Sequence, residues 1–291
     1  MIVYYALGGG LGHVTRGRAV IHTLGLEGPV TVVTSSPGAA DRRIVGDWNV
    51  VQLEGIRTAA ALRESVVEIL DEQRPHTIFV DAFPGGILGE LGPGLWPNGC
   101  DAFHVARALR WHRYTERLRG PLPEYRKVFG VEALGPQQLE ALGGTVEKLI
   151  LLDPPMRGTV PDVTGAWLIV HAGAEEEILD LVAYARERRD RDDPDSPLVL
   201  LSPHRPSALA PDINYLDHYP ARQLFKDAAR IVTACGFNSM RQTESFAEKH
   251  LSMPFERALD DQFSRAAQRR ADQRRATGSR MDGVVGSARR R

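Results

Sequence analysis

Short apolar runs recur along this chain without the alternating polar positions of a half-exposed strand, and segments with helical spacing separate them. A strand that is apolar on both sides must be covered on both sides, as in a parallel sheet with helices packed on each face. The sequence therefore predicts an α/β protein built from doubly wound parallel sheets. The expected strands are Ile2–Leu7, Val30–Thr34, Thr77–Asp81, Trp167–Val170, Leu198–Leu201 and Ile231–Thr233.

This pattern occurs twice. Prolines and glycines between residues 154 and 165 interrupt it, as is typical of a linker. At 291 residues the chain is also about twice the usual length of one domain. We expect an amino-terminal domain at 1–157, a second domain at 158–262 and a basic helix or tail at 263–291. Two Rossmann-like domains of this kind are expected to face a cleft, with ligands bound by loops that follow strands.

Composition excludes several classes of protein. The 36 basic and 37 acidic residues nearly cancel, which argues against a dedicated nucleic-acid binder. Two cysteines, Cys100 and Cys235, form neither a disulfide framework nor a four-cysteine zinc site. No apolar run reaches membrane-spanning length and no charged leader precedes the first strand, so we expect a cytoplasmic protein.

The carboxyl-terminal residues differ in kind from the rest. Residues 262–275 are predicted to form a polar helix, whereas residues 276–291 lack apolar periodicity. We expect a frayed basic tail, with peripheral contact to an anionic membrane or partner as the alternative.

A glycine-rich turn follows the first strand and ends in His13. It lacks the last glycine of the dinucleotide-binding fingerprint and the lysine of a Walker loop. Gly9, Gly10 and Gly12 allow a ligand to approach the start of the next helix. An imidazole at this corner can take a proton from a hydroxyl group, so His13 is a candidate general base; the alternative is a structural or helix-capping histidine. Asp81, at the end of another buried strand, is a candidate to orient His13 or bind an acceptor, or else a turn aspartate.

A second glycine turn follows Ile231–Thr233. Gly236 permits the bend, and Asn238 and Ser239 are types preferred at helix starts. The free amide groups of a helix beginning near Ser239 can hold a diphosphate, with the alternative of an ordinary capped helix. The turn at Gly173 is a poorer phosphate site because three glutamates follow it, at residues 175–177.

Two charged segments admit a simpler interpretation. Residues 190–195 hold several carboxylates, but charges of both signs surround them, so we expect a solvated loop rather than a metal site. Arg107, Arg110, Arg113 and Arg117 have the spacing of one helical face, which predicts solvated surface or, alternatively, a contact with an anionic acceptor or lipid.

Taken in order, these segments resemble the GT-B glycosyltransferases. The nearest groups are the UDP-glucuronosyl/UDP-glucosyl transferases and the N-acetylglucosaminyltransferase of peptidoglycan synthesis. The resemblance rests on Gly8, Gly9, Gly12 and His13, on residues 219–239, and on residues 254–262 with their closing Asp-Gln element.

The resemblance implies transfer of a sugar from a nucleotide sugar, with UDP as the expected nucleotide, to an acceptor hydroxyl of unknown identity, without a metal or other cofactor. It implies that His13 is the general base, that Gly236, Asn238 and Ser239 hold the diphosphate, and that Asp261 and Gln262 bind the sugar. Gln242 occupies the position of the family's ribose-binding glutamate. That departure leaves open an inactive nucleotide- or sugar-binding module, and a sugar-nucleotide 2-epimerase is a further alternative.

Overall fold

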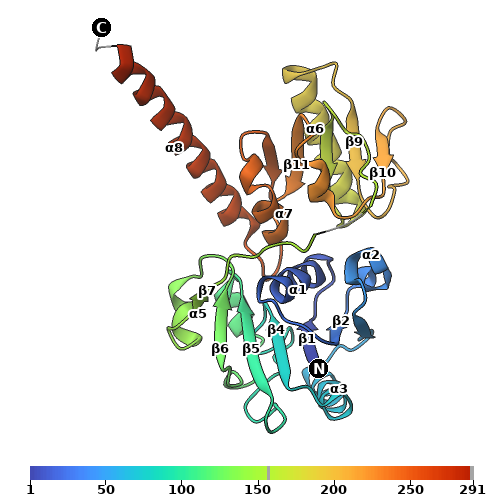
Figure 1. The fold of residues 1–291 in the computed structure, drawn as a ribbon, viewed down its shortest axis with the longest axis vertical. Helices are drawn as coiled ribbons and strands as arrows, with labels where there is room; N and C mark the ends of the chain where they lie inside the picture. Colours follow the sequence, from blue (N-terminus) through green and yellow to red (C-terminus); the bar gives the residue numbers. More distant parts are fainter. Residues whose placement is uncertain (156–157, 289–291) are drawn as a thin grey trace. The chain divides into compact units, whose positions relative to one another are not determined.

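The computed structural model describes residues 1–155 and 158–288, with side chains of the last helix described up to residue 275. The chain divides into two compact units. Unit 1 comprises Met1–Arg157 and Ala258–Asp260, and unit 2 comprises Gly158–Arg257 and Asp261–Arg291. Figure 1 shows the elements of both.

Unit 1 contains one fully parallel sheet with the strand order β3-β2-β1-β4-β5-β6-β7. The three strands predicted for this half are confirmed at its centre, where helices cover both faces and every residue between Ile2 and Ala6 is buried. The strands are β1 (Ile2–Ala6), β2 (Val30–Thr34), β3 (Asn49–Gln52), β4 (Thr77–Asp81), β5 (Asp101–Ala106), β6 (Lys127–Gly130) and β7 (Glu147–Lys148).

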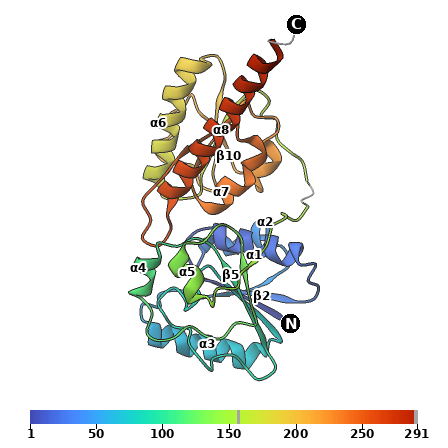
Figure 2. The ribbon, with the colours of Figure 1, turned by 90° about the vertical axis from the view of Figure 1, so that its left-hand side faces the viewer.

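Helices α1 and α3 lie on opposite faces of this sheet (Figure 2). Tyr4 packs against α1, where a Cβ atom at Gly17 would lie 2.7 Å from the tyrosine ring. Tyr5, the next residue of β1, points to the other face and joins Leu62 and Val66 of α3 in one apolar cluster. The helices are α1 (Gly12–Thr23), α2 (Arg42–Val45), α3 (Ala59–Gln73), α4 (Trp111–Thr115) and α5 (Pro136–Ala141), with a 3-10 turn η1 (Pro37–Ala40).

Unit 2 contains a second parallel sheet with the order β10-β9-β8-β11-β12. Its three predicted strands are also confirmed, and the chain therefore has the expected α/β architecture of two Rossmann-like sheets. The strands are β8 (Trp167–Val170), β9 (Leu198–Leu201), β10 (Asn214–Leu216), β11 (Arg230–Ala234) and β12 (His250–Met253). The helices are α6 (Glu175–Asp192), α7 (Phe237–Gln242) and α8 (Gln262–Ala288), with 3-10 turns η2 (Ala221–Leu224) and η3 (Glu244–Phe246).

Helix α6 is longer than the sequence suggested. The sequence predicted a solvated loop at 190–195, but the helix continues to Asp192. Ion pairs between Arg189 and Asp190 and between Arg191 and Asp192 accompany its last turn. The loop prediction is therefore wrong for residues 190–192, although most of this segment is exposed as expected.

Helix α8 is held to unit 2 by side chains spaced four residues apart. Arg265 donates to the carbonyl of Cys235, Arg269 to that of Met240, and Gln273 to that of Ala247. The helix runs to Ala288, beyond the predicted polar helix at 262–275, so the frayed tail is not found over 276–288. The side chains of 276–291, on which the predicted membrane contact depends, lie outside the described residues. Within residues 1–155 and 158–288, every helix is too short or too polar to cross a membrane.

Candidate functional site

The glycine-rich turn of unit 1 places His13 at the start of α1, beside the carboxyl end of the neighbouring strand β4. Because β1 and β4 are adjacent and parallel, the loop after one strand and the last residue of the other meet at the same edge of the sheet. His13 Nδ1 lies 2.6 Å from Asp81 Oδ2. The structure thus brings together the two candidates that the sequence singled out in this half.

Asp81 is the centre of a buried polar network. Arg16 donates from Nε to Oδ1 at 2.7 Å and from Nη2 to Oδ2 at 2.5 Å, and the Tyr4 hydroxyl donates to Oδ1 at 2.9 Å. Asp81 is 2% exposed and Arg16 3%. Burial alone would raise the pKa of Asp81, but Arg16 and His13 outweigh it and hold that pKa well below its usual range. The carboxylate therefore stays ionised at neutral pH.

An ionised Asp81 determines the tautomer of His13. The carboxylate only accepts hydrogen bonds, so Nδ1 of His13 carries the proton and Nε2 keeps its lone pair. Nη2 of Arg16 lies 3.2 Å from the same Nδ1, and two donors cannot bond each other, so this contact acts through charge. Burial and the nearby Arg16 and Arg107 lower the pKa of His13 and outweigh the opposing effect of Asp81. The site thus presents a neutral imidazole whose Nε2 can accept a proton.

The glycines of this turn differ in what they allow. Gly8 has φ +150°, and a Cβ atom there would lie 2.4 Å from His13 Nε2, so only glycine fits beside the ring. At Gly9 and Gly10 a Cβ atom would meet nothing within 4 Å, which leaves open space at the turn. Gly12 is the first residue of α1.

The backbone turns sharply immediately after Asp81. Ala82 has φ +64°, a left-handed conformation that is unfavourable for alanine. The amide of Ala82 donates to the carbonyl of Val105, which ties the turn to β5. The ring of Phe83 then lies 5.7 Å from the ring of His13. Asp81 and Phe83, the residues on either side of Ala82, therefore both lie beside His13.

The predicted arginine face does not exist. Helix α4 covers only Trp111–Thr115, so Arg107, Arg110, Arg113 and Arg117 are not on one helix. Arg107 is buried after β5, forms an ion pair with Asp260 of the same unit, and lies over the ring of Phe83 at 6.0 Å. Solvated surface is therefore the wrong interpretation for Arg107, since a short loop replaced the expected helix.

Arg16 and Tyr4 are the site residues that sequence reasoning missed. Arg16 follows His13 by three positions, which places both on one face of a helix, and that spacing is a usable signal. Tyr4 carried no signal of its own, because a tyrosine inside a buried strand is most simply a core residue.

The second glycine turn, in unit 2, begins α7. The N-cap residue is Gly236, with φ −66° and ψ 152°, and no side chain caps the helix. The expectation that Asn238 or Ser239 caps a helix beginning near Ser239 is wrong, because the helix begins two residues earlier, at Phe237. A Cβ atom at Gly236 would meet nothing within 4 Å, so the space beside this turn is open.

The rival turn at Gly173 is filled by side chains. A Cβ atom there would lie 2.3 Å from His171 Nε2 and 2.8 Å from Glu177 Oε2. These two atoms are 2.8 Å apart, and Arg257 forms an ion pair with Glu177. Arg257 thus neutralises the charge of Glu177. The Gly173 turn is a poorer phosphate site than the Gly236 turn because side chains fill it, and not because of its charge alone.

Asp261 and Gln262 both have local partners at the start of α8. Asp261 accepts from the amide of Ser264 at 3.0 Å and from its hydroxyl at 2.7 Å, as a helix cap does. Gln262 is buried, and its Oε1 accepts from the amide of Phe255 at 3.0 Å. Gln242 is the last residue of α7.

Among the side chains described up to residue 275, no group of three or more His, Cys, Asp or Glu is arranged to hold a metal ion. Cys100 and Cys235 are free thiols.

No protein-family model matches the chain, and a search of curated proteins gives no match. Solved structures do match over most of their length. The spinosyn forosaminyltransferase SpnP is 16% identical, with a TM-score of 0.57 and coverage of 93% of this chain and 83% of SpnP. The glycosyltransferase SsfS6 of Streptomyces sp. SF2575, solved with thymidine diphosphate, is 13% identical with a TM-score of 0.54, covering 88% and 82%.

A UDP-GlcNAc 2-epimerase from Neisseria meningitidis, solved with UDP-GlcNAc, also matches. It is 10% identical with a TM-score of 0.54 and coverage of 89% of this chain and 84% of the epimerase. At these identities the likeness bears on architecture alone, and it agrees with the two parallel sheets described above. The chain has the GT-B fold of these glycosyltransferases and epimerases.

Proposed function

We propose that this protein transfers a sugar from a nucleotide sugar to the hydroxyl group of an acceptor. The observation that carries this proposal is the neutral imidazole of His13, held by Asp81 through Nδ1 at 2.6 Å. That arrangement suits the removal of a proton from an alcohol near neutral pH. The similarity to glycosyltransferases and to proteins solved with thymidine diphosphate or UDP-GlcNAc supports the same reaction class.

In this mechanism Nε2 of His13 takes the acceptor proton as the hydroxyl oxygen attacks the anomeric carbon. The ionised Asp81 stabilises the imidazolium that forms, and general base catalysis of this kind contributes about 10²–10⁴-fold in rate. The bond from the anomeric carbon to the diphosphate breaks, and the nucleoside diphosphate leaves with the electron pair.

The donor is assigned to unit 2. The open turn at Gly236, the amides of the first turn of α7 and the Ser239 hydroxyl are proposed to hold the diphosphate, with Asn238 beside them. Gln242 is proposed to accept a ribose hydroxyl, and Asp261 and Gln262 to face the sugar in addition to their roles at the start of α8. This scheme uses no metal ion.

The experiment is a titration with UDP, thymidine diphosphate and a panel of their sugars, followed by thermal unfolding and by release of nucleoside diphosphate. A ligand at 100 times its Kd adds about 2.7 kcal/mol of stability. His13→Ala should remove turnover and leave donor binding intact. The control is His22→Ala, which changes an exposed histidine near the other end of α1. If none of the nucleotides or nucleotide sugars changes the thermal unfolding of the protein, the donor assignment is refuted.

A 2-epimerase is the second candidate, because such enzymes are among the similar structures. The structure disfavours Asp81 as an acid for that reaction, since Arg16, Tyr4 and His13 engage the carboxylate and keep it ionised. A product that keeps its nucleotide and changes stereochemistry at one sugar carbon would favour the epimerase. Binding of a nucleotide sugar without turnover would indicate a binding module instead.

A further inference from the structure

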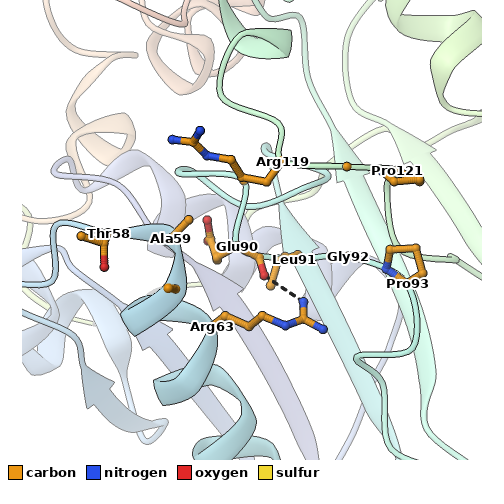
Figure 3. A pocket seen from close by; sticks show the side chains of 12 residues that line it. Thr58, Ala59, Arg63, Glu90, Leu91, Gly92, Pro93, Arg119 and Pro121 are labelled. Atoms are coloured by element: carbon orange, nitrogen blue, oxygen red, sulfur yellow. Dashed lines mark hydrogen bonds between the residues drawn. The ribbon is translucent and has the colours of Figure 1, made fainter.

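A cavity with a volume of about 540 Å³ lies in unit 1, apart from the His13–Asp81 site. Three segments line it: the first residues of α3, the loop at 89–93 and the loop at 119–121 (Figure 3). Cavities that bind small organic molecules have volumes of about 300–1,000 Å³. The space is therefore large enough for a compound of one ring with a charged substituent.

The charge around this cavity is positive. Arg63 and Arg119 both line it, and among the described residues neither has a carboxylate partner. Arg63 donates once, to the carbonyl of Glu90 at 3.1 Å, as Figure 3 shows. Helix α3 starts at the cavity. Thr58 caps it by accepting from the amide of Ala61 at 3.3 Å, but its first turn has no acidic residue, so no negative charge there offsets the positive end of the helix.

Glu90 is the acidic residue of the lining, and its carboxylate is already satisfied. Oε1 accepts from the Tyr5 hydroxyl at 2.6 Å and from the amide of Ile87 at 3.1 Å, and Oε2 accepts from the amide of Leu88 at 2.8 Å. Burial raises its pKa. The two guanidinium groups outnumber this one carboxylate, so the lining keeps a net positive charge.

The remaining walls are apolar or small. Ala59, Ala60, Leu91, Pro93 and Pro121 supply hydrocarbon surface between the arginines. A ligand that satisfies both features has an apolar body and one anionic group.

The cavity is separate from the His13–Asp81 site. Successive residues of a strand point to opposite faces, and the hydroxyl of Tyr4 reaches Asp81 whereas that of Tyr5 reaches Glu90. The cavity begins at α3, on the face of the sheet opposite α1 (Figure 2). Occupation of one site therefore does not require the other.

We propose that this cavity is a second binding site of unit 1, which takes a small organic anion with an apolar body and a carboxylate or phosphate group held by Arg63 and Arg119. The two anionic groups share the same chemistry of recognition by guanidinium.

The test is calorimetric titration of the full chain at low salt with phenyl phosphate, with benzoate and with neutral benzyl alcohol. We expect saturable binding of at least one anion, weaker or absent binding of the alcohol, and a loss of affinity as salt is raised. The anion that binds more tightly identifies the preferred group. Failure of both anions to bind, or equal binding of the alcohol, would overturn the proposal.

Variants locate the binding. Arg63→Gln and Arg119→Gln should each weaken binding about tenfold or more, as expected for loss of a charged hydrogen bond. Arg74→Gln, which removes the same charge at the other end of α3, is the matched control and should bind like the wild type. Unchanged affinity in both cavity variants would refute the assignment.

A steric variant tests the site without changing its charge. A Cβ atom at Gly92 would lie 3.6 Å from Arg63 and 3.9 Å from Pro121, so Gly92→Leu fits the backbone and extends a side chain at the cavity. It should abolish binding while its thermal unfolding stays unchanged. His13→Ala should not affect binding of the anions, and loss of binding in that variant would place them at the catalytic site instead.

Discussion

Replacing Asp81 by asparagine tests the buried network most directly. The amide has nearly the shape of the carboxylate but no charge, so Arg16 keeps its position and loses its counter-charge. Arg16 donates two hydrogen bonds to Asp81 and is 3% exposed. An unpaired charge then remains in the interior, where solvation is poor.

The expected loss of stability is large. Breaking a buried ion pair from one side costs about 3–5 kcal/mol. The hydrogen bond from the Tyr4 hydroxyl can persist to the amide oxygen, so it adds little to this figure. A domain is stable by about 5–15 kcal/mol in total, so Asp81→Asn should remove a substantial fraction of the stability of unit 1.

Urea unfolding of the wild type, Asp81→Asn, Arg16→Met and the double variant measures this effect. Because the second substitution removes the orphaned charge, the double variant should be less destabilised than the sum of the two single variants, by about 2 kcal/mol or more. Additive losses below about 1 kcal/mol each would refute the reasoning, because they are typical of a solvated pair.

The pH dependence of this difference has a defined sign. The folded pKa of Asp81 lies below its unfolded value of about 3.9, so its contribution is complete above that pH and is lost as pH falls through the folded pKa. The contribution of the Asp81 charge to the stability difference between wild type and Asp81→Asn should therefore be present at neutral pH and shrink below about pH 4.

Three further predictions concern other parts of the chain. Gly8→Ala should destabilise unit 1 by about 1–3 kcal/mol and displace the His13 ring, whereas Gly9→Ala, in open space, should do neither; urea unfolding and the histidine NMR signals distinguish them. Burial lowers the pKa of His250 to about 3, so unit 2 should lose up to about 5 kcal/mol as pH falls from 6.5 to 3, and His250→Gln should flatten that slope in acid titration. Arg269→Ala should release the first turns of α8, seen as faster hydrogen exchange there, and unchanged exchange would show that other contacts hold the helix.

The central strands were predictable because they are buried on both faces. Val30–Thr34 and Trp167–Val170 match their predicted bounds, since continuous apolar runs have few other places in a fold. Edge strands carry a weaker signal. Asn49–Gln52 borders its sheet and is half exposed, and its polar ends match those of a loop. The interior strand Asp101–Ala106 was missed because Asp101 and His104 interrupt its apolar pattern.

The candidate site was predictable only in part. His13 and Asp81 follow neighbouring parallel strands, so their approach depends on topology, which the strand pattern indicates. The other partners of the Asp81 carboxylate, Arg16 and Tyr4, depend on how α1 packs against β1, and no local sequence pattern indicates that packing. At Arg107 the sequence pattern was misleading. The arginines from 107 to 117 are spaced as on one helical face, but the chain forms a loop there, followed by the short helix α4.

The two tyrosines of β1 connect the catalytic candidate His13 to the cavity lined by Arg63 and Arg119. Their hydroxyls reach carboxylates at the two ends of one segment, Tyr4 to Asp81 and Tyr5 to Glu90. Burial raises the pKa of both tyrosines, so each hydroxyl stays protonated and donates. Residues 82–89 are therefore tied at both ends to the same strand, one end on each face of the sheet. The left-handed turn at Ala82 begins this segment. Hydrogen bonds from the buried strand β1 at both ends of the segment therefore offset the unfavourable backbone conformation of Ala82.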